Sequence, residues 1–219
     1  VKTGAGKTAS CSKTMKQDNT PTSATVTMKK ADGTDYKPET WSSQDVILTA
    51  SHDLYNSSQY QWFYAGSGNS LDGATKQIYT VSGLPGDYLV GVTNSATGKN
   101  KLSEKYQILV DKVTPPAPTI TATKTTAGTT VPVGTWSNQG LKFKFESDVS
   151  YNASGVPSIK YCVTSTLNGC TPNKDATNGA TVDTAVNEKG YYYVYAVAVS
   201  GAGLTSDVAM YSAKVDTIT

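Results

Sequence analysis

The chain has 219 residues, a formal net charge of +2, and only 37% hydrophobic and 16% charged residues. This length suggests one large or two ordinary domains. All 19 basic residues are lysines, and the absence of arginine argues against recognition of nucleic acid or phosphate, where the guanidinium fork supplies the geometry. No apolar run approaches membrane-spanning length and no signal peptide is visible. We therefore expect a mature or excised segment that does not insert into a membrane.

The first ten residues, VKTGAGKTAS, look like the end of a phosphate-binding loop. The full motif needs a further glycine five residues before Gly6 and a helix after the loop. Position 1 is valine, and the following residues have no apolar stripe at helical spacing. The stretch SGAGLTSD matches it later in the chain, with Leu204 in place of Lys7. We interpret the glycine-rich stretch as a hairpin turn, not as a nucleotide site.

The chain repeats itself over a long period. Asp18–Pro21 and Asp111–Pro115 each precede a threonine-rich strand, and Asp216 begins a third such stretch. Trp41-Ser42-Ser43-Gln44 recurs as Trp136-Ser137-Asn138-Gln139. A repeat of roughly one hundred residues is a domain repeat rather than a solenoid repeat. The predicted divisions are 1–17, the final strand of a preceding module; 18–111 and 112–217, two full modules; and 218–219, the start of a further linker.

Short runs of alternating apolar residues, separated by turn residues, indicate that each module is an all-β sandwich. The strands expected in the first module are 24–29, 45–50, 59–65, 76–81, 87–93 and 104–110. Those expected in the second are 118–124, 140–146, 158–164, 180–186, 190–199 and 207–215. Alternation places Val46 and Leu48 on the inner face of the first module and Leu141, Phe143 and Phe145 on that of the second.

The modules resemble bacterial immunoglobulin-like repeats of Gram-positive surface proteins. The resemblance is carried by the Thr-Pro linker, the Trp-Ser-x-Gln block, a Tyr-Cys…Cys-Thr-Pro hairpin and the stretch YAVAVSGAGLTS. It implies two tandem immunoglobulin-like sandwiches in a stalk, adhesin or pilus-like fibre outside the cell. The implied partners are other modules of the same protein or neighbouring subunits of a fibre. The fold alone hosts too many functions to identify a ligand.

Two features match that fold more closely. Trp62 lies in the middle of a strand, where immunoglobulin-type sandwiches place a core tryptophan, and Tyr161 occupies that region of the second module. Gly86-x-Tyr88 and Gly190-x-Tyr192 begin the penultimate strand of each module. Tyr88 and Tyr192 therefore fit the tyrosine corner, whose hydroxyl bonds back to the chain. The alternative is that both are ordinary strand residues.

Two of the three cysteines are placed to form a disulfide. Cys162 and Cys170 flank VTSTLNG, which contains the hairpin signal Asn168-Gly169. A disulfide there indicates an oxidising, exported setting. The alternatives are two free thiols or half of a zinc site, which lacks two further ligands nearby. Cys162 should point out of the sandwich, and Cys11 is left free or paired with another chain.

No residue type in the sequence points to catalysis or to a cofactor. His52 is the single histidine and precedes Asp53, but adjacent strand residues point apart, so we interpret it as an exposed loop residue rather than half of a dyad. The recurring aspartates Asp18, Asp111 and Asp216 raise the possibility of calcium. Because no Asp-x-Asp spacing accompanies them, we interpret them as turn and capping residues. We predict no metal and no cofactor.

The leading interpretation is a structural spacer or fibre-forming segment of a bacterial cell-surface protein, not an enzyme. The alternative is an adhesin module that binds a glycan or a host surface protein through the aromatic region 54–64. Tyr55, Tyr60 and Tyr64 are its candidate ligand-binding residues, although strand tyrosines around a core tryptophan explain the same pattern. We also expect residues 4–16 to pair with strands outside the two modules, because an isolated strand is unstable.

Overall fold

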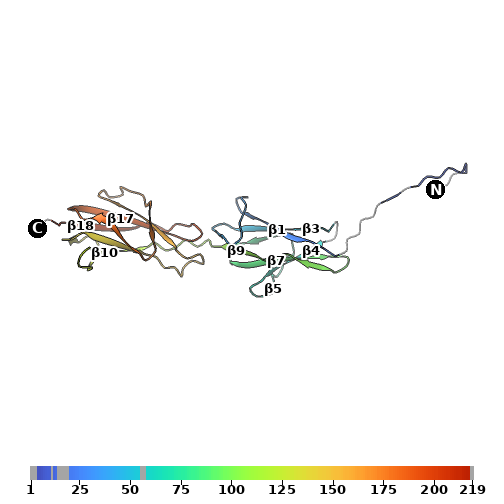
Figure 1. Cartoon of the computed structure of the whole chain (residues 1–219), viewed down its shortest axis with the longest axis horizontal. Helices are drawn as coiled ribbons and strands as arrows, with labels where there is room; N and C mark the ends of the chain where they lie inside the picture. The colour runs from blue at the N-terminus through green and yellow to red at the C-terminus, as the bar shows by residue number, and fades with distance from the viewer. Residues whose placement is uncertain (1–3, 11, 14–19, 55–57, 218–219) are drawn as a thin grey trace. The chain divides into compact units, whose positions relative to one another are not determined.

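The computed structural model describes residues 4–10, 12–13, 20–54 and 58–217, and the regular structure in this part of the chain is β (Figure 1). Its strands form four sheets, two from residues 24–110 and two from residues 119–215. We call these the first and the second module. Within the same described ranges, no helix has the length and apolar character needed to span a membrane. The prediction of an all-β fold is confirmed.

The first module has one sheet of three strands and one of six. The smaller sheet has the order β1 (Ala24–Lys30), β3 (Val46–His52) and β6 (Ile78–Val81). The larger has the order β2 (Trp41–Ser42), β9 (Tyr106–Val110), β7 (Gly86–Asn94), β4 (Ser58–Tyr64) and β5 (Asn69–Ser70), and β8 (Asn100–Leu102) also pairs with β7. Figure 1 shows β1 and β3 in one layer and β7 and β4 in the other.

The second module repeats this plan. Its smaller sheet has the order β11 (Thr130–Val131), β10 (Thr119–Lys124), β13 (Leu141–Glu146) and β16 (Thr181–Val186). Its larger sheet has the order β12 (Trp136–Ser137), β18 (Ala209–Val215), β17 (Gly190–Val199), β14 (Ser158–Thr164) and β15 (Lys174–Thr177).

The strand order identifies the topology. In each module the first, second and fourth long strands (β1, β3 and β6; β10, β13 and β16) share one sheet, and the third, fifth and sixth (β4, β7 and β9; β14, β17 and β18) share the other, as in immunoglobulin-type sandwiches. A two-residue strand then runs parallel to the last strand, pairing Trp41 with Leu109 and Trp136 with Lys214. The two modules are therefore immunoglobulin-like sandwiches built on one plan.

The first module packs around Trp62. Its side chain is fully buried, and the indole N–H donates to the carbonyl of Lys76 at 2.9 Å. Val46 and Leu48 lie on the inner face as predicted. A buried tryptophan needs both this apolar packing and a partner for its one polar atom. Trp62 therefore has both of the features that the predicted core position requires.

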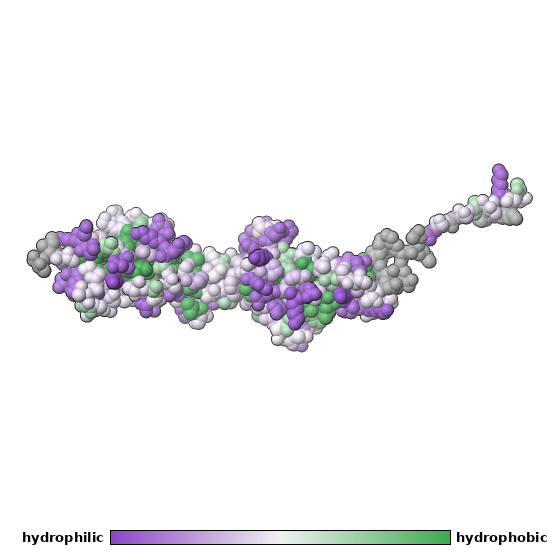
Figure 2. Space-filling view, in the orientation of Figure 1, coloured by the Kyte–Doolittle hydropathy of each residue, from purple (hydrophilic) through white to green (hydrophobic). Residues whose placement is uncertain are grey.

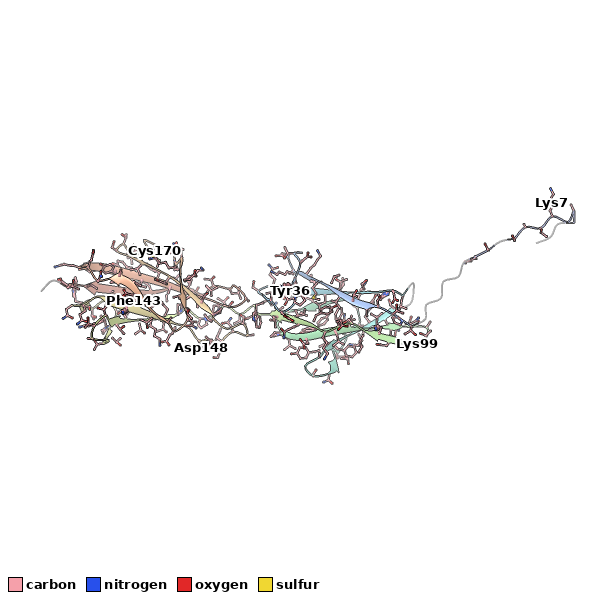
Figure 3. The ribbon with its side chains drawn as sticks, in the orientation of Figure 1. Lys7, Tyr36, Lys99, Phe143, Asp148 and Cys170 are labelled. Atoms are coloured by element: carbon pink, nitrogen blue, oxygen red, sulfur yellow. A yellow bond between two sulfur atoms is a disulfide. The ribbon has the colours of Figure 1, made fainter. Side chains whose placement is uncertain are left out.

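The second module packs around phenylalanines. Leu141, Phe143 and Phe145 are fully buried, as alternation predicted. Figure 3 labels Phe143 within this module. Tyr161 stacks on Phe145 with ring centroids 5.0 Å apart. The register shows that Val163, opposite Val194, is the counterpart of Trp62, which lies opposite Val90. Tyr161 is thus the counterpart of Tyr60. It lies two residues before the position equivalent to Trp62, near which the sequence analysis had placed it.

The glycine-rich segment before the first module is described only in part. Gly4 and Ala5 form a turn, and Gly6 has a φ of +74°, the left-handed region that glycine favours. The described residues 4–10 are exposed. Cys11, Asp18 and part of the strand expected at 4–16 lie outside the described residues. The pairing of this strand with another module stays a prediction.

Candidate binding surfaces

His52 does not form a dyad with Asp53. It is the last residue of β3 and is partly buried, not a loop residue, and its Nε2 lies 2.8 Å from the Tyr60 hydroxyl. The Leu54 N–H donates to Nδ1 at 3.1 Å. Because Nδ1 accepts a hydrogen bond, Nε2 carries the proton and donates to Tyr60. The imidazole therefore links the end of β3 to Tyr60 on β4.

Asp53 has a separate structural role. Its carboxylate accepts hydrogen bonds from the hydroxyl and N–H of Thr22 and from the N–H of Ser23. The Thr22 hydroxyl contributes most, followed by the Ser23 N–H, and together the hydrogen bonds lower the pKa of Asp53 to about 2. Asp53 thus ties the chain that enters β1 to the end of β3.

The tyrosines proposed as ligand-binding residues lie in two kinds of environment. Tyr60 is bonded to His52 and borders an open polar hollow of about 550 Å³, lined by Ser58, Gln59, Tyr60, Gln61, Thr75 and Thr93. Tyr64 packs edge-on against Tyr88, with ring centroids 5.4 Å apart. Its ring lies so close to Gly86 that a side-chain carbon there would come within 2.4 Å of it. Tyr55 lies outside the described residues.

The two predicted tyrosine corners, Tyr88 and Tyr192, differ in their contacts. The Tyr192 hydroxyl donates to the carbonyl of Glu188, four residues earlier, at 3.1 Å, which is the contact that a corner requires. Tyr88 is buried against Tyr64 and Tyr79, and burial raises the pKa of its hydroxyl. Its role as a corner stays a prediction.

Tyr36 is a structural tyrosine that the sequence analysis missed. Its buried hydroxyl donates to the Thr40 carbonyl at 2.7 Å and accepts from the Leu109 N–H at 2.9 Å (Figure 3). Burial raises its pKa against the effect of these hydrogen bonds. The single tyrosine thereby holds the last strand, β9, beside the loop that leads into β2. No strand pattern surrounds Tyr36, so only the structure reveals this contact.

Cys162 and Cys170 are joined by a disulfide, with Cα atoms 6.3 Å apart. The surrounding geometry differs from a tight hairpin, because β14 ends at Thr164 and β15 begins at Lys174. The intervening loop folds over the outer face, where the Asn168 N–H donates to the Tyr195 hydroxyl at 2.6 Å. Cys162 points away from the interior of the sandwich, as predicted. It is nevertheless buried, because the loop covers it.

Asp111 behaves as a capping residue. Its carboxylate accepts hydrogen bonds from the Val113 N–H at 3.0 Å, from the Ser154 N–H at 2.9 Å and from the Ser154 hydroxyl at 2.5 Å. Burial opposes its ionisation, but the hydrogen bonds from Ser154 and Val113 outweigh burial, so the pKa of Asp111 lies below its usual value. We call these contacts the Asp111 clamp. Among the described residues, no group of three acidic, histidine or cysteine side chains could hold a metal ion.

The second module also exposes an aromatic pair that the sequence analysis did not single out. Trp136 on β12 and Tyr191 on β17 flank Lys214 on β18, and all three belong to the outward set of the larger sheet. The first module has Trp41, Leu109 and Asp87 at the corresponding places. One difference in the sequence could have indicated this pair. After the glycine that begins the penultimate strand, the first module has Asp87 and the second has Tyr191.

Comparison with known proteins finds similarity to solved structures only. No family model matches the chain, and no curated protein matches it in sequence. Similar solved structures include domains of titin, with 12% identity and a TM-score of 0.47 over 90% of this chain and 67% of that one. Fibronectin(III)-like modules of Clostridium thermocellum CbhA match with 13% identity and a TM-score of 0.32 over 88% and 94%.

A third similar structure contains N-terminal domains of the outer capsid protein Hoc of bacteriophage RB49. It matches with 14% identity and a TM-score of 0.38 over 88% of this chain and 59% of that one. Identities this low concern the fold alone, and TM-scores of this size add no argument to it. The assignment of immunoglobulin-like sandwiches therefore rests on the strand order and the cores of this chain.

Proposed function

We propose that the chain is a load-bearing structural segment of a bacterial cell-surface protein, in which tandem modules separate other parts without catalysing a reaction. The observation that carries the proposal is the parallel pair at the end of each module. β2 runs parallel to β9, and β12 runs parallel to β18. The Asp111 N–H donates to the Ser42 carbonyl and the Asp216 N–H to the Ser137 carbonyl, each at 2.9 Å.

This pairing resists tension because of its direction. A pull on the two ends of a module draws the short strand, β2 or β12, towards its own N-terminal end. The same pull draws the last strand, β9 or β18, towards its C-terminal end. Since the two strands are parallel, their hydrogen bonds are loaded together in shear instead of opening one by one. A module with this geometry has a high barrier to forced unfolding, the property that a stalk or fibre needs.

The disulfide supports the exported setting of this proposal. Cys162 and Cys170 are bonded in the second module, and structural disulfides persist mainly outside the cytosol. The partners proposed are other modules of the same protein or neighbouring fibre subunits. Neither nucleic acid nor a membrane is a proposed partner.

Force spectroscopy on the 219-residue chain tests the proposal. Asp216→Pro removes the N–H that bonds to Ser137, whereas Asp216→Ala removes only the carboxylate and keeps that hydrogen bond. We expect the proline variant to lower the unfolding force of the second module and the alanine variant to leave it nearly unchanged. Equal forces for the proline variant and the unmodified chain would remove the mechanical argument.

The second candidate function is an adhesin module that binds a glycan or a host protein through region 54–64. The observation that favours it is the open polar hollow beside Tyr60, where glutamine and threonine side chains offer hydrogen bonds to a polar ligand. Glycan-array binding by the full chain that is lost on Tyr60→Ala or Tyr64→Ala, with the fold intact by circular dichroism, would support this candidate. Binding that survives both substitutions would exclude it.

A further inference from the structure

We propose that the outer face of the larger sheet in the second module binds a glycan. The proposed site comprises Trp136, Tyr191 and Lys214, which we call the aromatic platform, together with Asn138 and Asp216 beside it. This inference goes beyond the structural function proposed above, and neither depends on the other.

The platform is built by strand register. Trp136 pairs with Lys214 across the parallel β12–β18 ladder, and Tyr191 pairs with the same lysine across the antiparallel β17–β18 ladder. The three side chains therefore form one row across three strands. The rings of Trp136 and Tyr191 are 5.6 Å apart at their centroids and inclined by 63°. The Lys214 Nζ lies 5.7 Å from the centre of the Tyr191 ring.

Both rings remain open to solvent. Trp136 is 52% exposed and Tyr191 is 54% exposed. An exposed tryptophan packed against an exposed tyrosine is unusual, because large rings gain most by burial. The register brings the two rings together edge to face, with the Lys214 Nζ over the Tyr191 ring, while about half of each residue stays accessible to a ligand. This arrangement provides a preformed surface at little cost in side-chain ordering.

Polar groups also border the tryptophan. Trp136 lines an open hollow of about 690 Å³ together with Lys124, Ser137, Asn138 and Asp216. The Asn138 Oδ1 accepts from the Lys124 Nζ at 2.9 Å. Within the described ranges, the Asn138 Nδ2 has no hydrogen-bond partner and can donate outward. The Asp216 carboxylate, 3.0 Å from the Lys189 Nζ, supplies acceptor oxygens at the same rim.

A sugar fits this combination better than other ligands. A pyranose ring has C–H groups that pack on an aromatic face and hydroxyls at its rim that bond to amide and carboxylate groups. A nucleic acid or another polyanion would require a basic surface, whereas here Asp216 lies among the lysines. A stable protein interface needs a large apolar core, whereas Trp136 borders Lys124, Asn138 and Asp216. On the face of the molecule that Figure 2 draws, hydrophobic and polar residues are interspersed.

The first module lacks the same row and thereby provides an internal control. Trp41 is present there, but Leu109 stands in place of Lys214, Asp87 in place of Tyr191 and Ser43 in place of Asn138. A carboxylate at position 87 cannot stack on a sugar, and serine has no amide to donate. The proposal therefore assigns binding to the second module alone.

The experiment uses the full chain with α-glucan, β-glucan, chitin and galactan hexasaccharides, each at up to about 10 mM, a range that detects weak affinities. Saturation-transfer NMR and tryptophan fluorescence measure binding. We expect at least one of these sugars to bind, and Trp136→Ala and Tyr191→Asp to lower its affinity roughly tenfold each. Trp41→Ala, the matched control, should change affinity less than about twofold.

Each alternative result overturns the proposal. No saturation transfer from any of the four sugars would show that the platform is not a glycan site. Binding that survives both Trp136→Ala and Tyr191→Asp would place the site elsewhere. Self-association of the chain that Trp136→Ala abolishes, seen by sedimentation without sugar, would assign the platform to a contact between copies. Circular dichroism of each variant verifies folding, which the half-exposed positions make tolerant of substitution.

Discussion

The third long strand of the first module carries Trp62 where the same strand of the second module carries Val163. In the second module Phe143, Phe145 and Tyr161 fill the interior that the indole fills in the first. The two interiors thus reach close packing with different side chains on one strand order. The comparison teaches that the plan depends on the alternation of buried positions and on total volume, not on one conserved ring.

The outer faces differ more than the interiors. In the second module a disulfide-closed loop lies over Tyr195, and the aromatic platform is exposed on the same larger sheet. In the first module the place of Tyr191 is taken by Asp87, and no disulfide lies among the described residues. Outward positions of a sandwich are free to change without loss of the core. This freedom is why a difference in ligand binding is expected on the outer faces.

Trp62→Ala should have the largest effect and should be confined to the first module. Removing a fully buried indole costs about 3 to 5 kcal/mol of unfolding free energy, and it also leaves the Lys76 carbonyl without its donor. Val163→Ala, the control in the second module, should cost less because valine is smaller. Hydrogen exchange resolved by residue measures both. An equal loss of protection in residues 119–215 would contradict the prediction that the effect of Trp62→Ala is confined to the first module.

Loss of the disulfide should be the next largest effect and should be confined to the second module. Closing the short loop between Cys162 and Cys170 is worth about 2 to 3 kcal/mol by the chain-entropy argument. The double variant Cys162→Ala with Cys170→Ala should lower the urea midpoint of the second module and speed exchange at Asn168. If the double variant unfolded at the same urea concentration as the unmodified chain, the loop would be folded without help from the bond.

The Asp111 clamp should make stability depend on pH. The pKa of Asp111 lies below its usual 3.8 in the folded chain. Its stabilisation is therefore complete above that usual value and is lost as the pH falls through the lower, folded-state pKa. Asp111→Ala should cost about 1 to 3 kcal/mol at neutral pH, because Ser154 and Val113 lose their acceptor.

Asp216 provides the matched control for this clamp. Its side chain is 37% exposed and pairs with Lys189, so Asp216→Ala should cost about 1 kcal/mol or less. Thermal unfolding from pH 7 to pH 2 separates the two variants. Asp53, whose pKa is also lowered, contributes equally in both variants. An Asp111→Ala chain that keeps the full acid sensitivity of the unmodified protein would contradict the contribution assigned to Asp111.

Tyr60→Phe should have the smallest effect. It removes the hydroxyl that accepts from His52, at a cost of about 0.5 to 1.5 kcal/mol. Tyr161→Phe, at the corresponding place in the second module, should leave the stacking on Phe145 intact and change little. Chemical denaturation of both variants sharpens the comparison. A larger loss for Tyr161→Phe would show that its hydroxyl has a structural role.

The long strands were predictable because they alternate over four to ten residues, which is enough to reveal period two. All twelve expected strands are present, with ends shifted by no more than two residues. The six strands that were missed, β2, β5, β8, β11, β12 and β15, have two to four residues. A stretch this short carries no readable period, and pairing with a neighbouring strand alone makes it a strand.

The candidate site was less predictable for the same reason. Trp136 lies in a two-residue strand, so alternation could not assign its face, and its partner Tyr191 is distant in sequence. Asn168-Gly169 correctly indicated a turn, and Asn168 has a φ of +58°. The turn lies inside a longer loop, since the disulfide and the contact with Tyr195 hold that loop to the sheet. Such tertiary contacts are not visible in local sequence.

Stretching the whole chain with and without a reducing agent tests the load-bearing proposal most directly. We predict two separate force peaks, one for residues 24–110 and one for residues 119–215, each releasing on the order of 30 nm of chain. Reduction should lengthen only the second release, by about 2 nm, because the bond holds two Cα atoms 6.3 Å apart that are separated by 8 positions. Smooth extension without force peaks would contradict the proposal that these modules bear load.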